Sequence, residues 1–266
     1  MLIRRARQAG GTSTCAIAVM AKASVAGRTK TRLVPPLTLE QAAELNTAFL
    51  ADIADNLALA AQQADIAVYV AFSPPGSAPF FENHLPPEIG LIESWFPNFG
   101  DCLFHTARSL LDLGYGAGCV LNSDSPTLPT ECLVETARTL ARPGDRIVLG
   151  PSIDGGYYLL GLKQPHRRLF DDIAWSTEQV ARQTLDRGAE LGLETVMLPS
   201  WYDVDDANAL QALVRETLHG VEFSEKMRSH NARHSGAALR RIMRNGNLLD
   251  QAEPLRLVRL KEARSA

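Results

Sequence analysis

Short apolar runs alternate with longer segments of helical periodicity along most of this chain, and this alternation constrains the fold more than any other feature. The run at 15–21, CAIAVMA, is continuously apolar, as strands buried in a parallel sheet tend to be. Parallel neighbours need a long crossover connection, which is usually a helix. The pattern therefore predicts an α/β fold with a mainly parallel, Rossmann-like sheet and helices on both faces.

The expected strands cover 15–21, 66–72, 91–96, 118–124, 146–149, 157–162 and 194–199. Helices are expected after the first strand, where Leu45, Phe49, Ile53 and Leu57 recur at four-residue spacing, and over 101–113, 130–140, 176–190 and 206–218. Two of them should begin at capping boxes, TLEQ at 38–41 and STEQ at 176–179. The Pro-rich segment 73–90 is expected to be a long loop, which could serve as a lid.

Composition describes an ordinary globular protein with a distinct tail. The 266 residues are 45% hydrophobic, which is enough for a real core, and a net charge of -3 does not suggest nucleic-acid binding. Four cysteines without a CxxC pair predict free thiols and a cytoplasmic protein. No segment reaches the apolar length of a membrane helix. We expect a flexible arm at 1–14, one domain at 15–218 and a basic extension at 219–266.

The C-terminal extension holds ten Lys or Arg residues against five Asp or Glu residues. Leu239, Ile242 and Met243 alternate there with arginines, which makes a short basic amphipathic stretch. Such a stretch could contact a partner or an anionic membrane surface, or pack as an extra helix. It motivates one non-enzymatic hypothesis, a nucleotide-binding protein whose tail recruits a partner.

In parallel α/β sheets, ligands bind at the carboxyl ends of the strands, so the loops after the strands carry the functional signal. The loop after the first strand holds four cations, Lys22, Arg28, Lys30 and Arg32. Guanidinium forks match phosphate oxygens and a lysine supplies a point charge. The loop is therefore a candidate phosphate cradle, with a merely solvated basic loop as the alternative.

Two other loops carry acids. Asp124 ends an apolar strand just before Pro126, and a carboxylate in that position suits Mg²⁺, which prefers one or two carboxylates plus substrate phosphates. After the last strand, Asp203 and Asp205 alternate onto one face, while Asp206 could cap the next helix. The sequence leaves open which of Asp203 and Asp205 faces a metal, and both loops could instead be solvated acidic turns.

The stretch GPSIDGGYYLLGL at 150–162 places a carboxylate and a bare backbone between two apolar strands. Gly155 and Gly156 would let a ligand approach the main chain, and Asp154 could accept hydrogen bonds from hydroxyl groups. Tyr157 or its neighbour can line a pocket. The stretch could instead be only a turn. Taken together, the loops suggest that the ligand is a nucleotide diphosphate that carries a sugar, and that a metal and the cations stabilise the charge that develops on the diphosphate.

Five segments now support a family resemblance: MAKASVAGRTKTRL, NSDSPTLP, LGPSIDGGYYLLGL, LFDDIAWSTEQV and DVDDANAL. In this order they resemble a bacterial family of GT-A-type proteins related to nucleotide-diphospho-sugar transferases, some with an arsenosugar-biosynthesis-type glycosyltransferase label. The resemblance implies a GT-A fold and a divalent metal, Mg²⁺ or Mn²⁺, with Asp124 as the metal-binding acid and Asp205 as a second ligand. Departures are Ser24 for a usual Pro, Asn122 for a Gly, and Asp206 with Ala209 in the last segment.

The expected function is a metal-dependent glycosyltransferase that uses a nucleotide-diphosphate sugar and an acceptor that the sequence does not identify. Asp154 is the candidate catalytic base, since an inverting reaction needs one, and Tyr157 with Trp175 would shape the sugar or acceptor site. The alternative is a nucleotidyltransferase that uses an NTP and releases pyrophosphate. The two chemistries share this fold, so the fold does not separate them.

Overall fold

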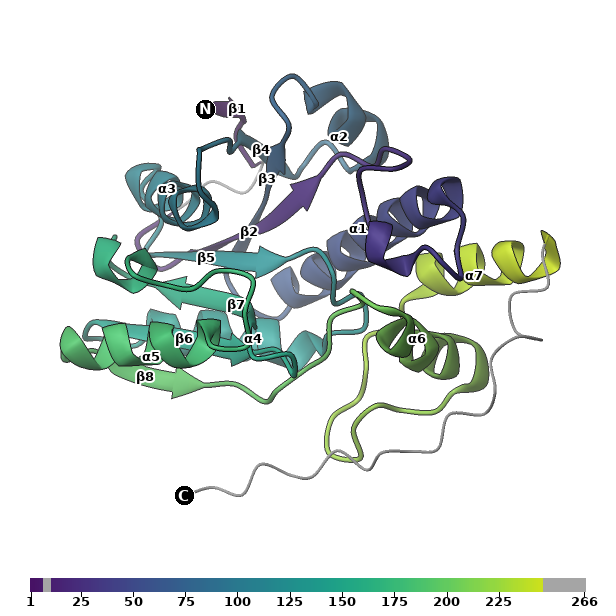
Figure 1. The fold of residues 1–266 in the computed structure, drawn as a ribbon. Helices are drawn as coiled ribbons and strands as arrows, with labels where there is room; N and C mark the ends of the chain where they lie inside the picture. The colour runs from purple at the N-terminus through teal and green to yellow at the C-terminus, as the bar shows by residue number, and fades with distance from the viewer. Residues whose placement is uncertain (7–10, 246–266) are drawn as a thin grey trace.

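The computed structural model describes residues 1–6 and 11–245 (Figure 1). Its strands are β1 (Leu2–Arg4), β2 (Cys15–Lys22), β3 (Ile66–Ser73), β4 (Gly90–Glu93), β5 (Ala117–Asn122), β6 (Arg146–Pro151), β7 (Tyr157–Leu162) and β8 (Glu194–Met197). Within the described ranges they form one eight-stranded sheet in the order β1-β4-β3-β2-β5-β7-β6-β8. Only the pairs made by β1 and β7 are antiparallel in this sheet. The predicted mainly parallel α/β sheet is confirmed.

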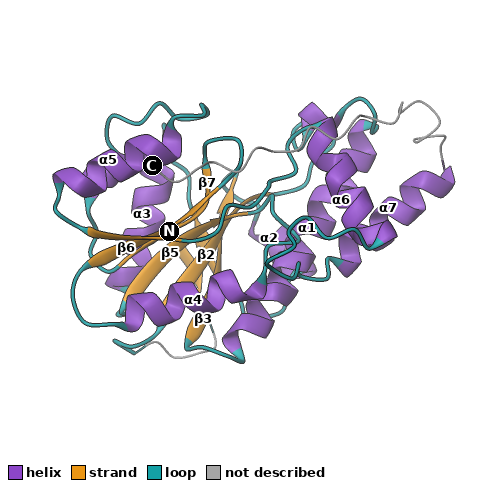
Figure 2. Cartoon of the chain, turned by 90° about the horizontal axis from the view of Figure 1, so that it is seen from below, coloured by secondary structure: helices purple, strands orange, loops and turns teal. Residues whose placement is uncertain are grey.

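The helices are α1 (Leu39–Ala61), α2 (Ala78–His84), α3 (Phe99–Asp112), α4 (Thr130–Ala141), α5 (Val180–Glu190), α6 (Ala207–His219) and α7 (Arg233–Asn245). Short 3₁₀ turns lie at Thr31–Leu33 and Arg167–Phe170. Figure 2 shows α3 and α5 on one side of the sheet and α4 on the other. Side chains of the strands pack against helices on both faces of the sheet. Ile17 lies in the same core cluster as Phe49 of α1, and Val120 lies in the same cluster as Leu103 of α3.

One predicted capping box is confirmed and the other is wrong. At Thr38 the side chain accepts a hydrogen bond from the Gln41 amide (3.2 Å), and the Gln41 side chain accepts one from the Thr38 amide (2.8 Å). At Ser176 the backbone is left-handed (φ 66°), and α5 begins only at Val180, without a side-chain cap. The Thr177 hydroxyl instead donates to the carbonyl of Ala174 (2.7 Å), which closes a turn before the helix.

The predicted long loop at 73–90 contains α2, so that prediction is wrong. Pro79 lies in the first turn of this helix, where its missing N–H costs nothing. Phe81 is fully buried and its ring packs 5.0 Å from that of Phe72. The segment is therefore anchored to the core of the described protein.

The predicted irregular arm at 1–14 differs from the structure at Leu2–Arg4, which forms β1. Leu2 pairs with Ile92 of β4 in antiparallel register. The strand is too short and too exposed to leave an apolar pattern in the sequence. Residues 7–10 of the arm lie outside the described residues.

The predicted amphipathic stretch at 239–244 lies in α7, which packs along α1 (Figure 1). Leu239 and Ile242 are buried in the main core cluster. Asp52 of α1 fixes the start of α7, because its carboxylate accepts hydrogen bonds from the amides of His234 and Ser235 (2.8 Å each) and from the Ser235 hydroxyl (2.5 Å). The apolar side of α7 is thus part of the fold. Residues 246–266 of the predicted extension lie outside the described residues.

Candidate functional site

Three loops at the carboxyl edge of the sheet meet at Lys30. Its ammonium group lies 2.7 Å from Asp124 Oδ1 and 2.8 Å from Asp205 Oδ1, and it donates to the carbonyl of Val204 (2.8 Å). The Val204 amide in turn donates to the carbonyl of Asp124 (2.8 Å). The loops after β2, β5 and β8 are therefore joined through one lysine, two carboxylates and their main chains.

Lys30 is held tightly in this position. Its side chain is only 6% exposed, and its ammonium also lies 5.4 Å from the centre of the Phe49 ring. The three ammonium protons match three oxygens, so the group is satisfied although it is buried. Burial works against the charge, but the carboxylates of Asp124 and Asp205 prevail and raise the pKa of Lys30 above its ordinary value.

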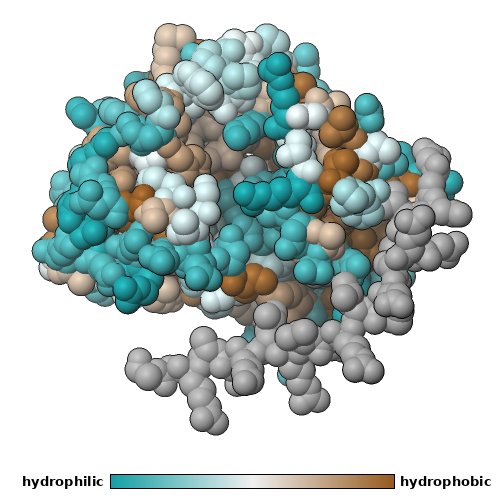
Figure 3. Space-filling view, in the orientation of Figure 1, coloured by the Kyte–Doolittle hydropathy of each residue, from teal (hydrophilic) through white to brown (hydrophobic). Residues whose placement is uncertain are grey.

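The other three cations of the predicted cradle behave differently. Lys22, Arg28 and Arg32 are exposed, and within the described part of the chain their side chains form no hydrogen bond or ion pair. Figure 3 shows a mainly hydrophilic surface with separate apolar patches on the face of the molecule drawn there. The loop thus divides into one buried, paired lysine and three cations that are available to an anion.

The acidic residues of the loop after β8 also differ in their contacts. Asp205 contacts Lys30, whereas Asp206 caps α6 by accepting a hydrogen bond from the Ala209 amide (2.8 Å), as predicted. Burial, and then the charges of Asp154, Asp205 and Asp124, raise the pKa of the Asp203 carboxyl to about 7. Four carboxylates therefore share this edge of the sheet with one buried ammonium.

The stretch at 150–162 forms the β6–β7 hairpin beside these loops. Asp154 Oδ1 accepts a hydrogen bond from the Gly156 amide (2.9 Å), and the Ser152 amide donates to the Gly156 carbonyl (3.0 Å). The Ile153 amide donates to the carbonyl of Trp201 (3.0 Å), which ties the turn to the segment after β8. The turn is thus fixed against the acidic loop by its main chain.

The backbone conformation and packing at Gly155 explain why this position holds a glycine, and the sequence did not indicate this explanation. Its backbone is left-handed (φ +92°), and an added Cβ would overlap the main chain of Glu178. The Ala181 amide also donates to its carbonyl (2.9 Å). At Gly155 the bare backbone therefore makes room for the chain before α5 rather than for a ligand. The nearest atom to a Cβ at Gly156 would be Asp154 Oδ1, at 3.2 Å.

The two tyrosines of the hairpin face different surroundings. Tyr158 is fully buried and its hydroxyl donates to the Pro199 carbonyl (2.9 Å). The Tyr157 hydroxyl is buried with no hydrogen-bond partner among the described residues, and burial raises its pKa. Its ring lies 6.5 Å from that of Trp175, which packs edge-on against Phe99 (5.5 Å). Tyr157 and Trp175, both predicted site residues, are thus brought together.

Two exposed aromatic residues near this end of the sheet are not among the predicted site residues. Trp95, which follows β4, is 62% exposed, and Phe99 at the start of α3 is 53% exposed. A tryptophan and a phenylalanine placed on either side of Pro97, directly after a strand, were the available signal. Exposed aromatic rings at such an edge provide flat surfaces on which a sugar or an aromatic group can pack.

The donor set at Lys30 fits a divalent cation. Asp124 and Asp205 already share one cation, the Lys30 ammonium, and the same two carboxylates would hold a metal. No cluster of three or more His, Cys, Asp or Glu residues within 1–6 and 11–245 has a metal-binding arrangement. Substrate oxygens would therefore have to complete the coordination, as is usual for Mg²⁺. Nearby, Asn122 Oδ1 is buried with no partner in the described chain.

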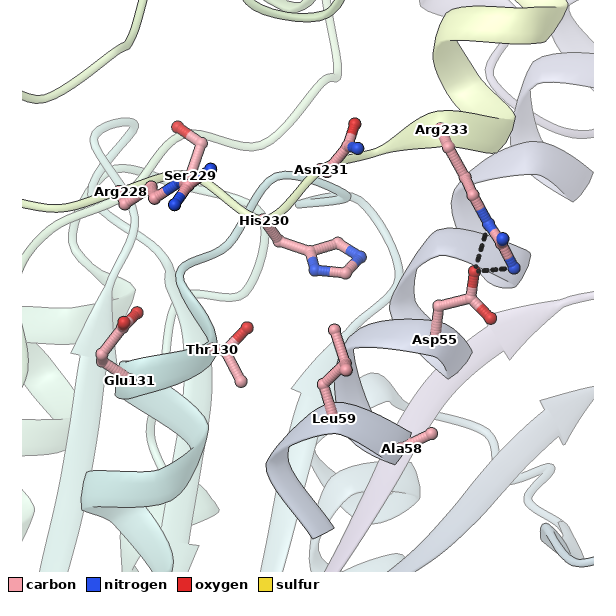
Figure 4. Close-up of a pocket in the computed structure, with 10 residues that line it drawn as sticks. All are labelled: Asp55, Ala58, Leu59, Thr130, Glu131, Arg228, Ser229, His230, Asn231 and Arg233. Atoms are coloured by element: carbon pink, nitrogen blue, oxygen red, sulfur yellow. Dashed lines mark hydrogen bonds and ion pairs between the residues drawn. The ribbon is translucent and has the colours of Figure 1, made fainter. Parts of the chain in front are cut away.

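A separate cavity of about 520 Å³ lies between α1, the start of α4 and the segment before α7 (Figure 4). Asp55, Thr130, His230 and Arg233 are among its lining residues, and Arg233 is paired with Asp55 (2.9 Å). None of the predicted site residues lines it. The residues predicted from the loop sequences therefore gather at the sheet edge and not in this cavity.

Comparison with known proteins identifies a similar family and similar folds. Residues 56–177 match the profile of a bacterial family described as "Uncharacterized protein conserved in bacteria (DUF2064)". A crystal structure from Desulfovibrio desulfuricans G20, described as a "putative nucleotide-diphospho-sugar transferase", is 27% identical with a TM-score of 0.74, and the match covers 89% of this chain and 97% of that one. The resemblance to a bacterial GT-A-like family is confirmed.

The GT-A-like fold extends to more distant structures. CMP:2-keto-3-deoxy-manno-octonic acid synthetase in complex with CTP is 11% identical with a TM-score of 0.50, and the match covers 78% of this chain and 100% of that one. This likeness concerns the fold alone. No protein with a curated description matches the sequence. In the described part of this GT-A-like chain, no helix combines the length and the apolar character that a membrane crossing requires.

Proposed function

We propose that this protein is a transferase that binds a nucleotide-diphosphate sugar and moves the sugar to a small acceptor. The observation that carries the proposal is the junction of three loops at Lys30, Asp124 and Asp205, with exposed cations beside it. Such an edge combines groups for an anionic diphosphate with groups for a cation. The 27% identity to the Desulfovibrio protein over 89% of this chain supports the same class of donor.

The loop after β2 would hold the diphosphate. Lys22, Arg28 and Arg32 are exposed and have no partner in the described chain, so binding an anion would break no existing contact. Asp124 and Asp205 would hold a divalent cation, Mg²⁺ or Mn²⁺. When bound, this ion would offset the charge that develops on the leaving diphosphate.

The hairpin side of the edge would hold the sugar and the acceptor. In the reaction an acceptor oxygen forms a bond to the anomeric carbon, and the bond from that carbon to the diphosphate breaks, so that the diphosphate leaves with the electron pair. Asp154 would take the acceptor proton. One of its oxygens is fixed by the Gly156 amide, and the other forms no hydrogen bond in the described structure. Tyr157 and Trp175 would form the apolar wall of this site.

Product analysis tests the proposal. The full chain is incubated with Mg²⁺ or Mn²⁺ and a panel of UDP-, GDP- and dTDP-sugars or the four NTPs, and released nucleotide diphosphate and pyrophosphate are quantified. We expect slow release of nucleotide diphosphate from one sugar donor, by transfer to water, and about 100-fold less in Asp154→Asn if this residue is the base. Pyrophosphate from an NTP would instead assign a nucleotidyltransferase, and nucleotide binding without either product would favour a non-catalytic binding protein.

A further inference from the structure

The ammonium of Lys30 contacts both carboxylates that would hold a divalent cation. It lies 2.7 Å from Oδ1 of Asp124 and 2.8 Å from Oδ1 of Asp205, so a metal held by these two residues would have to compete with it for their negative charge. The two cations would then lie close together at a buried position. Their repulsion would disfavour simultaneous binding of the ammonium and the metal by the same two carboxylates.

We propose that Lys30 is a built-in counter-cation, which competes with the divalent cation for Asp124 and Asp205 and transfers its ammonium to the diphosphate when the nucleotide binds. This inference rests on the proposed function, because it assigns Lys30 a part in admitting the donor and its cation to the same site. Lys30 acts here as a positioning residue in the free protein.

The contacts of Lys30 explain why a metal alone would bind weakly. All three ammonium protons have oxygen partners, and the side chain is 6% exposed, so the two carboxylates already share one buried positive charge. A metal that arrives alone must displace this group and leave a buried ammonium without partners. A metal that arrives with a diphosphate brings new oxygens that can accept the released ammonium.

The position of Lys30 in the chain makes this exchange feasible. It belongs to the same loop as Arg28 and Arg32, whose exposed side chains are available to phosphate oxygens. Its own backbone is left-handed (φ 51°) at the start of the 3₁₀ turn Thr31–Leu33, a conformation that costs energy in a residue other than glycine. The three oxygen contacts of the ammonium stabilise this conformation. A phosphate bound by the same loop would offer the ammonium alternative oxygens nearby.

A titration with Mn²⁺ alone tests the exchange without any enzymatic activity. Free Mn²⁺ is measured by its electron paramagnetic resonance signal in the absence of nucleotide, for the wild-type full chain and for Lys30→Met. The variant keeps a long apolar stem and lacks the ammonium. We expect it to bind Mn²⁺ about tenfold or more tightly than the wild type, and we expect Asp205→Asn in the same background to abolish the gain.

Lys22→Met is the matched control, because it removes a cation from the same loop without touching either carboxylate. Melting curves show which variants are folded, and Lys30→Gln provides a second neutral side chain. Equal or weaker Mn²⁺ binding by a folded neutral variant overturns the proposal, as does an equal gain in Lys22→Met. Since no nucleotide is present, failure here is distinct from failure of the proposed function, which the donor panel tests.

Discussion

Lys30 and Asp205 lie 175 positions apart in the chain, yet their charged groups meet at 2.8 Å. This contact joins the loop after β2 to the loop after β8, and Asp124 adds the loop after β5. A single buried ammonium therefore determines how three loops are placed at the sheet edge. Its removal should affect the stability of the fold as well as ligand binding.

Lys30→Met should lower the free energy of unfolding by about 1–3 kcal/mol, because it leaves two carboxylates and the Val204 carbonyl without their donor. Urea denaturation at neutral pH measures the change. Lys22→Met, at an exposed position of the same loop, should stay within about 0.5 kcal/mol of the wild type. Equal stability of the two variants would mean that water replaces the ammonium at no cost.

Gly155→Ala should be strongly destabilising, since the left-handed backbone costs about 1–2 kcal/mol and the overlap with Glu178 adds about 1–3 kcal/mol. Gly114→Ala is a close control, because φ is +96° there and nothing lies within 4 Å of the added Cβ. Thermal melting of both variants separates backbone strain from overlap. If the two variants melt at the same temperature, the packing of Gly155 against Glu178 is not as described.

Leu239→Ala should lower the free energy of unfolding by about 2–5 kcal/mol, because this side chain is 2% exposed and packs in the main core cluster. Arg240→Ala, on the exposed side of the same helix, should change it by less than about 0.5 kcal/mol. Chemical denaturation distinguishes the two. A small effect of Leu239→Ala would show that α7 is not an integral part of the fold in solution.

Stability should fall with acidification through His230. Burial lowers the pKa of His230 below its ordinary value and outweighs the nearby charge of Asp55, while Arg233 acts in the same direction as burial. The unfolded chain therefore binds a proton more readily than the folded one. The stabilisation is complete above the unfolded pKa of about 6.5 and is lost as the pH falls from there through the lower pKa of the folded protein.

Free energies of unfolding measured at about pH 7.5 and about pH 5.5, on either side of the unfolded pKa, give the size of this loss. His230→Gln should lose less stability between them than the wild type. His219→Gln, at an exposed position at the end of α6, should follow the wild type. An unchanged pH dependence in His230→Gln would contradict a neutral, buried His230. Glu131 and Arg228 line the same cavity and remain in all three proteins.

Local signals in the sequence predicted much of the fold. The capping box at Thr38 and the cap at Asp206 involve residues three positions apart, so the sequence contains the whole interaction. The capping box expected at Ser176 failed because a turn fixed by Thr177 and Ala174 precedes the helix. The short α2 was missed because Pro79 reads as a loop residue, although Pro is also favoured in a first helical turn.

The sequence predicted which loops meet at this edge of the sheet but not how their side chains pair. Loops after parallel strands must converge, so the acids and cations of the edge could be named from the sequence alone. That Lys30 would pair with Asp124 and Asp205, while Lys22 and Arg28 stay exposed, depends on contacts between distant residues, 175 positions apart for Lys30 and Asp205. Sequence patterns are read over windows of only about 11–18 residues and do not contain such pairings. Asp205 contacts Lys30, whereas burial and the neighbouring carboxylates raise the pKa of Asp203.

Calorimetric titration of nucleotide-diphosphate sugars into the full chain with Mn²⁺ tests the central claim most directly. We expect one sugar donor to bind with a dissociation constant between about 1 μM and 1 mM, and Asp205→Asn to weaken it at least about tenfold. Asp206→Asn should bind as the wild type does, because asparagine caps a helix as well as aspartate. Binding that Asp205→Asn leaves unchanged, or no binding of any nucleotide sugar, would contradict the assignment of this edge as the donor site.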